Sequence, residues 1–377
     1  MAKAKKPKSF VYELFDSYRT SVVSLFFFKE RKFFLIISIL LILAGALYPY
    51  ANIAMWLGFL FAGYSAIAND SIQTIGTFLA SNGKRPWWVL WLFIGGIFVV
   101  TMSVSWYLYH GDVSFQRLSA KGFEKAPENF QFLQLAAPLI LLLLTRLRMP
   151  VSTTFLCLSA YSANLAGIEK MFQKSLFGYG IAFIVSLVVW FLLAKTIKRI
   201  TTGHPHPIWT TLQWIISGFL WAVWLMQDGA NIAITLPRQL SIMQFLFFLA
   251  YIFLGLGLLL YLRGDKIQEI INEKSEVTDV RGATLIDFIY SLILLFFQNI
   301  SNVPMSTTWV FLGLLAGREL AMTVSQHFTG TRTLQAASKL IVKDIVYAFI
   351  GLIISILTAI AVNASIQKEI LELLAAN

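Results

Sequence analysis

The chain has 377 residues, of which 58% are hydrophobic and only 13% are charged. Soluble globular domains usually carry about 25% charged residues, so this composition excludes an ordinary soluble domain. The net charge of +11 does not indicate nucleic-acid binding, because the basic residues lie in the N-terminal tail and in connecting segments such as 195–199 and 339–343. The positive-inside rule and anionic lipid headgroups account for them there. We therefore expect a multi-pass integral membrane protein whose partner is the lipid bilayer.

The N-terminal residues 1–32 are predicted to form a basic, amphipathic segment on the cytoplasmic face. No short apolar stretch with a small-residue cleavage site follows the lysine-rich start directly, so no cleaved signal peptide is expected. Residues 9–32 are amphipathic and end in Lys-Glu-Arg-Lys, which is typical of a helix beside a membrane.

Long uncharged runs recur through the rest of the chain. Most approach the ~20 residues that a helix needs to cross the hydrocarbon core, and short segments that turn back bring the total to roughly ten to twelve. The predicted fold class is all-α, a polytopic transmembrane helical protein. Examples of the runs are Phe33–Tyr48, Trp88–Tyr109, Ile181–Ala194, Gln244–Leu262 and Tyr347–Val362.

The first polar cluster within an apolar run is Ala68-Asn69-Asp70-Ser71-Ile72-Gln73-Thr74. A carboxylate at the bilayer centre costs about 2.5–3.5 kcal/mol, so such residues are rare and usually functional. Asp70, Asn69 and Thr74 supply carboxylate, amide and hydroxyl oxygens, which suit a hard cation such as Na⁺. Two other interpretations stay open: Asp70 carries a proton, or it caps a helix at the membrane surface.

The next polar string is Pro150-Val151-Ser152-Thr153-Thr154, which follows an apolar run and a loop at 110–129 of balanced charge. Proline tends to end the helix before it. A serine or threonine beside it can cap a new helix, whose first N–H groups and positive dipole end attract anions. The alternative is that each hydroxyl bonds back to its own helix.

Both motifs return in the same order in the second half. Gln227–Ala233 holds Asp228 and Asn231, and the string Pro304-Met305-Ser306-Thr307-Thr308 follows. The offset is 162 residues for the first motif and 154 for the second. Duplicated polar breaks in hydrophobic segments point to the substrate site of a transporter, often at the interface of inverted repeats.

We therefore predict two related transmembrane repeats with a shared ion site. The repeats are residues 33–195 and 208–363, joined by a loop at 196–207 and followed by a tail at 364–377. The predicted cation ligands are Asp70, Thr74 and Asp228, with the two aspartates as the Na⁺ candidates. The predicted anion ligands are Asn69, Ser152, Thr153, Thr154, Asn231, Ser306, Thr307 and Thr308.

Other polar residues carry weaker signals. Cys157 is the only cysteine, which excludes an intramolecular disulfide and a cysteine metal site. His204 and His206 lie in a basic loop with no carboxylate beside them. Arg238 is interpreted as an interface anchor, with anion neutralisation or a pair with Asp228 as alternatives. No nucleophile elbow, zinc-protease or phosphate-loop motif occurs, so no enzyme and no cofactor is expected.

At these motifs the sequence resembles the inorganic phosphate transporter (PiT) family. The resemblance rests on Ala68-Asn69-Asp70, Gly229-Ala230-Asn231, Pro150–Thr154 and Pro304–Thr308, and it covers residues 60–320. It implies two inverted repeats with hairpins that meet near the midplane. It also implies cation-coupled phosphate uptake, with the Ser/Thr strings and asparagines at the anion and the aspartates at sodium.

The sequence departs from that family at several motif positions. Ile232 stands where the resemblance implies an aspartate, and Asp228, where relatives often have histidine, offers a replacement charge. Gln73 replaces an asparagine, and Phe155 and Trp309 replace both histidines. These changes leave open a sulfate or other anion permease driven by Na⁺ or H⁺, or a membrane protein that binds a ligand without transport. A prokaryotic inner membrane is the expected location, and the resemblance suggests a homodimer.

Overall fold

In a computed structural model of the chain, the described residues are 30–120, 123–147, 149, 151–162, 164–262, 279–325 and 333–375. Within these ranges every regular element is helical and no strand occurs, so the predicted all-α class is confirmed. Most of the N-terminal segment, Arg148 and Pro150 lie outside the described residues, as does the side chain of Gln73.

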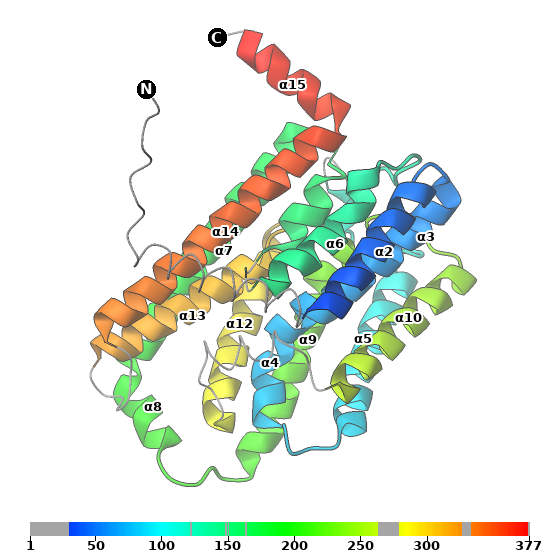
Figure 1. Cartoon of the computed structure of the whole chain (residues 1–377). Coiled ribbons are helices and arrows are strands. Elements are labelled where there is room, and N and C mark those ends of the chain that lie inside the picture. The colour runs from blue at the N-terminus through cyan, green and yellow to red at the C-terminus, as the bar shows by residue number, and fades with distance from the viewer. Residues whose placement is uncertain are drawn as a thin grey trace, which may run out of the picture.

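The helices follow one another along the chain (Figure 1). Those of the predicted first repeat are α2 (Arg31–Leu47), α3 (Ala51–Ser65), the π-helical turn η1 (Ala66–Asp70), α4 (Ser71–Ser81), α5 (Trp87–Leu108), the 3₁₀ turn η2 (Arg117–Ser119), α6 (Phe132–Arg146), the π-helical turn η3 (Thr154–Leu158) and α7 (Leu165–Leu192). The short helix α8 (Ala194–Thr201) lies mostly in the stretch 196–207 that the sequence predicts to be a loop. Then come α9 (Ile208–Ala233), α10 (Ile242–Tyr261), α12 (Val280–Ile300), α13 (Thr307–Val324), α14 (Leu334–Val362) and α15 (Ala364–Ala375).

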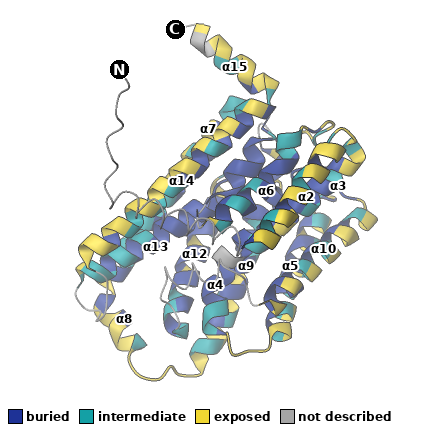
Figure 2. Cartoon of the chain, viewed as in Figure 1, coloured by how far each residue is buried: buried dark blue, intermediate teal, exposed yellow. Residues whose placement is uncertain are grey.

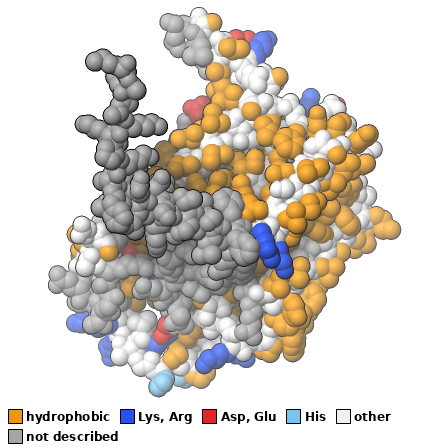
Figure 3. Space-filling model, viewed as in Figure 1, with side chains coloured by type: hydrophobic (Ala, Val, Ile, Leu, Met, Phe, Trp, Pro, Cys, Tyr) orange, Lys and Arg blue, Asp and Glu red, His pale blue; other side chains and the backbone are white. Residues whose placement is uncertain are grey.

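Among the described residues, seven helical segments are long and apolar enough to cross a membrane. They are α3 with η1, α5, α7, α9, α10, α12 and α14, while α6 is apolar but has only 15 residues. The outward faces of α2 and α10 carry exposed aliphatic side chains such as Ile42 and Met243. Hydrophobic side chains cover that side of the molecule (Figure 3). The chain is therefore a polytopic helical membrane protein.

Helix α9 occupies the centre of the structure. It packs against α12, α5, α4 and α3, and buried residues gather around it (Figure 2). Trp221 and Trp224 are each 1% exposed and stack with ring centroids 4.8 Å apart. Because α9 continues through Ala233, its polar motif lies inside an unbroken helix. The matching motif of the first half instead lies in the turn η1, between α3 and α4.

Helices α13 and α7 approach each other unusually closely. A Cβ atom at Gly313 would overlap the Tyr179 carbonyl oxygen, and one at Gly317 would overlap the Phe183 carbonyl oxygen. Small residues four apart let two membrane helices bring their backbones together, because lipid offers no hydrophobic drive for association. The same two helices also meet at the start of α13, where the Ser306 N–H donates to Ser175 Oγ of α7 at 2.8 Å.

Candidate functional site

Both Pro-x-Ser-Thr-Thr strings begin a helix in the same way. Ser152 Oγ accepts a hydrogen bond from the Phe155 N–H at 3.2 Å, and Ser306 Oγ accepts one from the Trp309 N–H at 3.1 Å. These are side-chain N-caps, in which a hydroxyl satisfies one of the free N–H groups of the first turn. The predicted caps are confirmed for both serines. The first copy runs into the turn η3, whereas the second begins the 18-residue helix α13.

The two strings lie in direct contact. Thr154 Oγ1 lies 3.2 Å from the Met305 carbonyl oxygen. The rings of Phe155 and Trp309, which follow the two strings, have centroids 5.2 Å apart. The duplicated motifs therefore pack against each other in the interior, although they come from different halves of the sequence.

Asp228 lies at the centre of the hydroxyl groups that the two strings supply. Thr307 Oγ1 donates to Asp228 Oδ2 at 2.6 Å, and Thr154 Oγ1 lies 3.5 Å from Asp228 Oδ1. The Asn231 amide donates to Asp228 Oδ1 and, at 3.1 Å, to Thr154 Oγ1. Trp224 Nε1 donates to Thr307 Oγ1 at 3.3 Å, which fixes that hydroxyl as a donor towards Asp228.

Asp70 forms a second, adjacent group. The Asn69 amide donates to Asp70 Oδ1 at 2.6 Å, and Asn69 Oδ1 accepts from Thr145 Oγ1 at 3.2 Å. Thr74 Oγ1 donates to the Asp70 carbonyl at 3.1 Å. The Asp70 carboxylate is close enough to Asp228 and to the Thr153 hydroxyl to interact electrostatically with both. The structure thus brings all the predicted site residues into one region.

The region is closed to solvent in this structure. The most exposed predicted site residue is Thr308, at 5%, and Asp70 and Asp228 are 3% and 2% exposed. Burying two carboxylates near each other is costly unless a positive charge or a proton compensates them.

Four buried polar atoms around the two aspartates have no hydrogen-bond partner among the described residues: Asp70 Oδ2, Thr153 Oγ1, Asn231 Oδ1 and Gln227 Oε1. Native structures leave few such atoms, and each calls for an explanation such as an ion. All four are oxygens, and carboxylate, amide and hydroxyl oxygens are what a hard cation prefers. These residues therefore fit a monovalent or divalent hard cation better than a soft metal.

Two cationic side chains near this region were missed by the sequence interpretation. Arg117 was assigned to an exposed loop of balanced charge, but it is 0% exposed and donates to the Gln298 side chain and to the Ser301 carbonyl. Burial lowers its pKa to about 10, and the nearby Asp228 charge opposes this change. Lys174 on α7 donates to the carbonyls of Ser301 and Val303 at 2.9 and 2.8 Å.

Both cations hold the segment that leads from α12 into the second Ser-Thr-Thr string. They add positive charge to the same end of the site as the N-terminus of α13. The only signal in the sequence was the excess of basic residues, which does not say which of them is buried. Tyr290 was also missed: its hydroxyl donates to the Thr307 carbonyl at 3.0 Å and lies beside Thr74.

Arg238 bonds to backbone carbonyls. Its guanidinium donates to Phe123, Ile234, Leu236 and Lys125 oxygens at 2.8–3.1 Å, so it ties the 110–129 loop to the end of α9. This arrangement agrees with the anchoring interpretation and not with a pair to Asp228.

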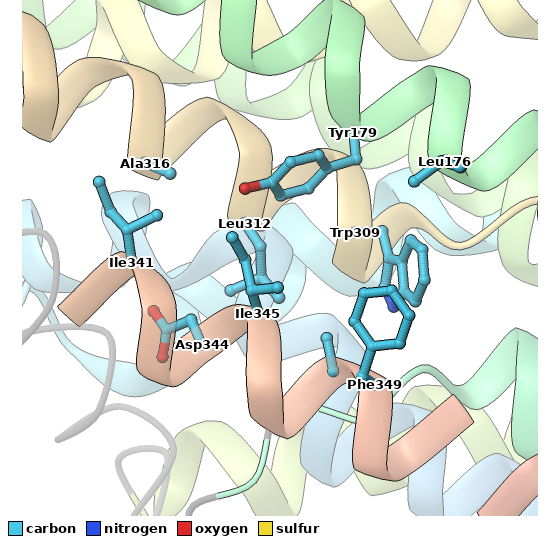
Figure 4. Close-up of a pocket in the computed structure, with 10 residues that line it drawn as sticks. Leu176, Tyr179, Trp309, Leu312, Ala316, Ile341, Asp344, Ile345 and Phe349 are labelled. Atoms are coloured by element: carbon cyan, nitrogen blue, oxygen red, sulfur yellow. The ribbon is translucent and has the colours of Figure 1, made fainter. Parts of the chain in front are cut away.

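An apolar cavity of about 70 Å³ lies between α7, α13 and α14 (Figure 4). Trp309 lines it and also contacts Phe155, so this side chain stands between the cavity and the hydroxyl groups. The cavity walls are Leu, Ile, Ala and aromatic side chains, with Asp344 towards one end. It therefore suits a lipid chain rather than an inorganic ion.

Comparisons of this chain with protein-family models, with curated proteins and with solved structures found no match.

Proposed function

We propose that the chain is a secondary transporter of an inorganic oxyanion, with phosphate as the favoured cargo, coupled to Na⁺ or H⁺. The observation that carries this proposal is the direct contact of the two Ser-Thr-Thr strings around Asp228, inside the membrane helices. Duplicated motifs that meet at depth are the arrangement of a transporter site between repeats. The resemblance to inorganic phosphate transporters supports the same assignment.

The anion is expected at the start of α13. The first turn of that helix offers N–H groups and the positive end of an 18-residue helix dipole. Thr308 adds a hydroxyl donor, and Arg117 and Lys174 add positive charge nearby. A tetrahedral oxyanion needs several convergent donors, which this end of the site supplies.

Na⁺, as one of the two candidate coupling ions, is expected between Asp70 and Asp228. The unpartnered oxygens of Asp70, Thr153, Asn231 and Gln227 are suitable ligands. A cation there would also offset one of the two negative charges and so reduce the repulsion between these carboxylates. Occupancy by both ions would leave the site closer to electroneutral, which gives a physical reason for coupled transport.

Transport requires the closed site to open alternately to each side. The two halves supply the walls, since Ser152–Thr154 comes from the first and Asp228 with Ser306–Thr308 comes from the second. Movement of one half against the other would expose the shared site. We place this carrier in a prokaryotic inner membrane, with a homodimer as the assembly suggested by the resemblance.

The test is uptake of labelled phosphate into proteoliposomes under imposed Na⁺ or pH gradients, with unlabelled sulfate as competitor. Phosphate accumulation that depends on a cation gradient and is lost in Asp70→Asn supports the proposal. Stronger competition by sulfate than by phosphate would change the cargo, in keeping with the apolar Phe155 and Trp309 beside the hydroxyls. Binding of either anion without accumulation would instead identify a ligand-binding protein.

A further inference from the structure

A third carboxylate is buried inside the membrane helices, and the proposed ion site does not use it. Asp287 on α12 is 1% exposed. Thr77 Oγ1 of α4 donates to Asp287 Oδ1 at 2.5 Å, and Ser217 Oγ of α9 donates to Asp287 Oδ2 at 2.5 Å. The carboxylate thus joins three helices that belong to both halves of the chain.

No cationic side chain among the described residues forms an ion pair or hydrogen bond with Asp287. The faces of α4 and α9 that meet it present Thr77 and Ser217. Within the described part of the chain, the charged and titratable groups on the surrounding elements make no hydrogen bond or ion pair with Asp287: they are Tyr290 and Arg281 on α12, Asp70 before α4, Asp228 on α9, Glu169, Lys170, Lys174 and Tyr179 on α7, Arg318 and Glu319 on α13, and Lys195, Lys198 and Arg199 on α8.

Polar side chains connect Asp287 to the proposed ion site. Tyr290 lies one turn further along α12; its hydroxyl donates to the Thr307 carbonyl and lies beside Thr74. Thr74 in turn lies one turn before Thr77 on α4 and donates to the Asp70 carbonyl. Thr74 and Thr77 on α4, with Tyr290 and Asp287 on α12, therefore form a row of polar side chains spaced by one helical turn between the site and Asp287.

The row continues from Asp287 towards one surface of the protein. Ser81 accepts from the Gln213 side chain, and the Asn82 amide donates to Gln213 Oε1 at 2.8 Å. Ser81 is partly exposed, and the following residues 83–86 are exposed. Polar side chains thus stand one turn apart on α4 (Thr77 and Ser81) and on α9 (Ser217 and Gln213) between Asp287 and these exposed residues.

We propose that Asp287 is the proton-binding station of this transporter and that the coupling ion is H⁺. This inference rests on the proposed function. The ionised carboxylate takes up one proton from the Ser81 side and becomes a neutral acid. Its new O–H then donates to Thr77 or Ser217, so that hydroxyl turns and donates to its own helix. Loss of the proton restores the two bonds seen here. Each cycle therefore changes the hydrogen bonds that join α12 to α4 and α9. Intramembrane carboxylates with hydrogen-bonded neighbours are the usual parts of proton relays.

The test uses the full chain in proteoliposomes, with labelled phosphate and labelled sulfate measured in parallel. Two assays are needed: accumulation driven by an imposed pH gradient, and exchange against the same anion inside without any gradient. For Asp287→Asn we expect loss of pH-driven accumulation, while exchange stays measurable, because the amide cannot cycle a proton. Asp344→Asn on α14, outside the polar row, is the matched control and should behave as the unmodified protein.

Thr77→Val is the second variant, which keeps the carboxyl but removes one donor. It should shift the pH at which accumulation is half-maximal, and Thr101→Val, a buried threonine of α5 outside the row, should not. Normal pH-driven accumulation in Asp287→Asn overturns the inference, as does an unchanged pH profile in Thr77→Val. Accumulation driven by Na⁺ alone, with no proton movement, also overturns it and leaves the proposed function standing. If the unmodified protein shows neither accumulation nor exchange of either anion, the proposed function itself is contradicted.

Discussion

The rings of Phe155 and Trp309 lie with centroids 5.2 Å apart and planes inclined by 60°, although 154 residues separate them in the chain. Each ring directly follows a Ser-Thr-Thr string, and the two are 1% and 4% exposed. An aromatic pair of this kind contributes about 0.5–1.5 kcal/mol beyond the area that it buries. The pair therefore holds the duplicated motifs together at the point where their hydroxyls converge.

Removing one ring of this pair should destabilise the protein. For Trp309→Ala we expect the free energy of unfolding to fall by roughly 3–5 kcal/mol, because a large buried side chain leaves a cavity that the helices only partly fill. Thermal unfolding in detergent measures the change. Phe349→Ala is the control, since Phe349 lines the same apolar cavity but is 47% exposed. An equal fall in the free energy of unfolding in both variants would mean that the contact between Phe155 and Trp309 adds no particular stability.

The Thr307 hydroxyl should matter more than its size suggests. Thr307→Val keeps the shape but leaves Asp228 Oδ2 without its 2.6 Å donor. A buried charged group that loses its partner costs about 1–3 kcal/mol or more. We expect lower thermal stability and loss of anion uptake in proteoliposomes.

Thr323→Val on the same helix is the matched change, because the Thr323 hydroxyl bonds only to the Glu319 carbonyl of its own helix in the described contacts. Uptake by Thr307→Val at the level of Thr323→Val would remove Thr307 from the site.

The close contact of α13 with α7 predicts a strong effect at Gly317. A Cβ there would overlap the Phe183 carbonyl oxygen, so Gly317→Ala must push the two backbones apart. Overpacking of this kind typically costs about 1–3 kcal/mol, and we expect a lower melting temperature together with weaker anion binding. Gly180→Ala on α7 is the control, because nothing lies within 4 Å of its Cβ position. A harmless Gly317→Ala would show that the helices are further apart than described.

Arg117 should not be replaceable by lysine. Its planar guanidinium reaches both the Gln298 side chain and the Ser301 carbonyl, and a lysine ammonium on a flexible stem cannot reproduce that fork. For Arg117→Lys we expect reduced affinity for the anion, seen as a higher phosphate concentration at half-maximal uptake. The exposed Arg199 gives the matched variant Arg199→Lys, which should leave that concentration unchanged. Equal affinities in the two variants would contradict a role of Arg117 in positioning the second motif.

Local interactions explain which site features were predictable. The serine caps at Ser152 and Ser306 join atoms three residues apart, so proline and serine next to an apolar run suffice to predict them. The polar clusters that hold Asp70 and Asp228 recur in the same order as the two strings, so the duplication also predicts these two aspartates as site residues. The π-helical turn at Ala66–Asp70 has no counterpart in the continuous helix α9. The sequences of the two copies differ at Asp70 and Ile232, but this difference does not by itself predict a π-helical turn in one copy and a continuous α-helix in the other.

The sequence by itself determined the all-α membrane fold, because uncharged runs of about 20 residues must satisfy their backbone groups internally in lipid. It also determined the polar residues of the candidate site. Only the tertiary structure decided that Thr154 reaches Met305 and that Asp70 lies near Asp228. Only the tertiary structure shows that Arg117, in the loop of balanced charge, is buried, and that Asp287 accepts hydrogen bonds from two hydroxyls. The physical reason is that hydropathy selects which helices form, whereas the contacts between helices distant in sequence depend on the close packing of their side chains.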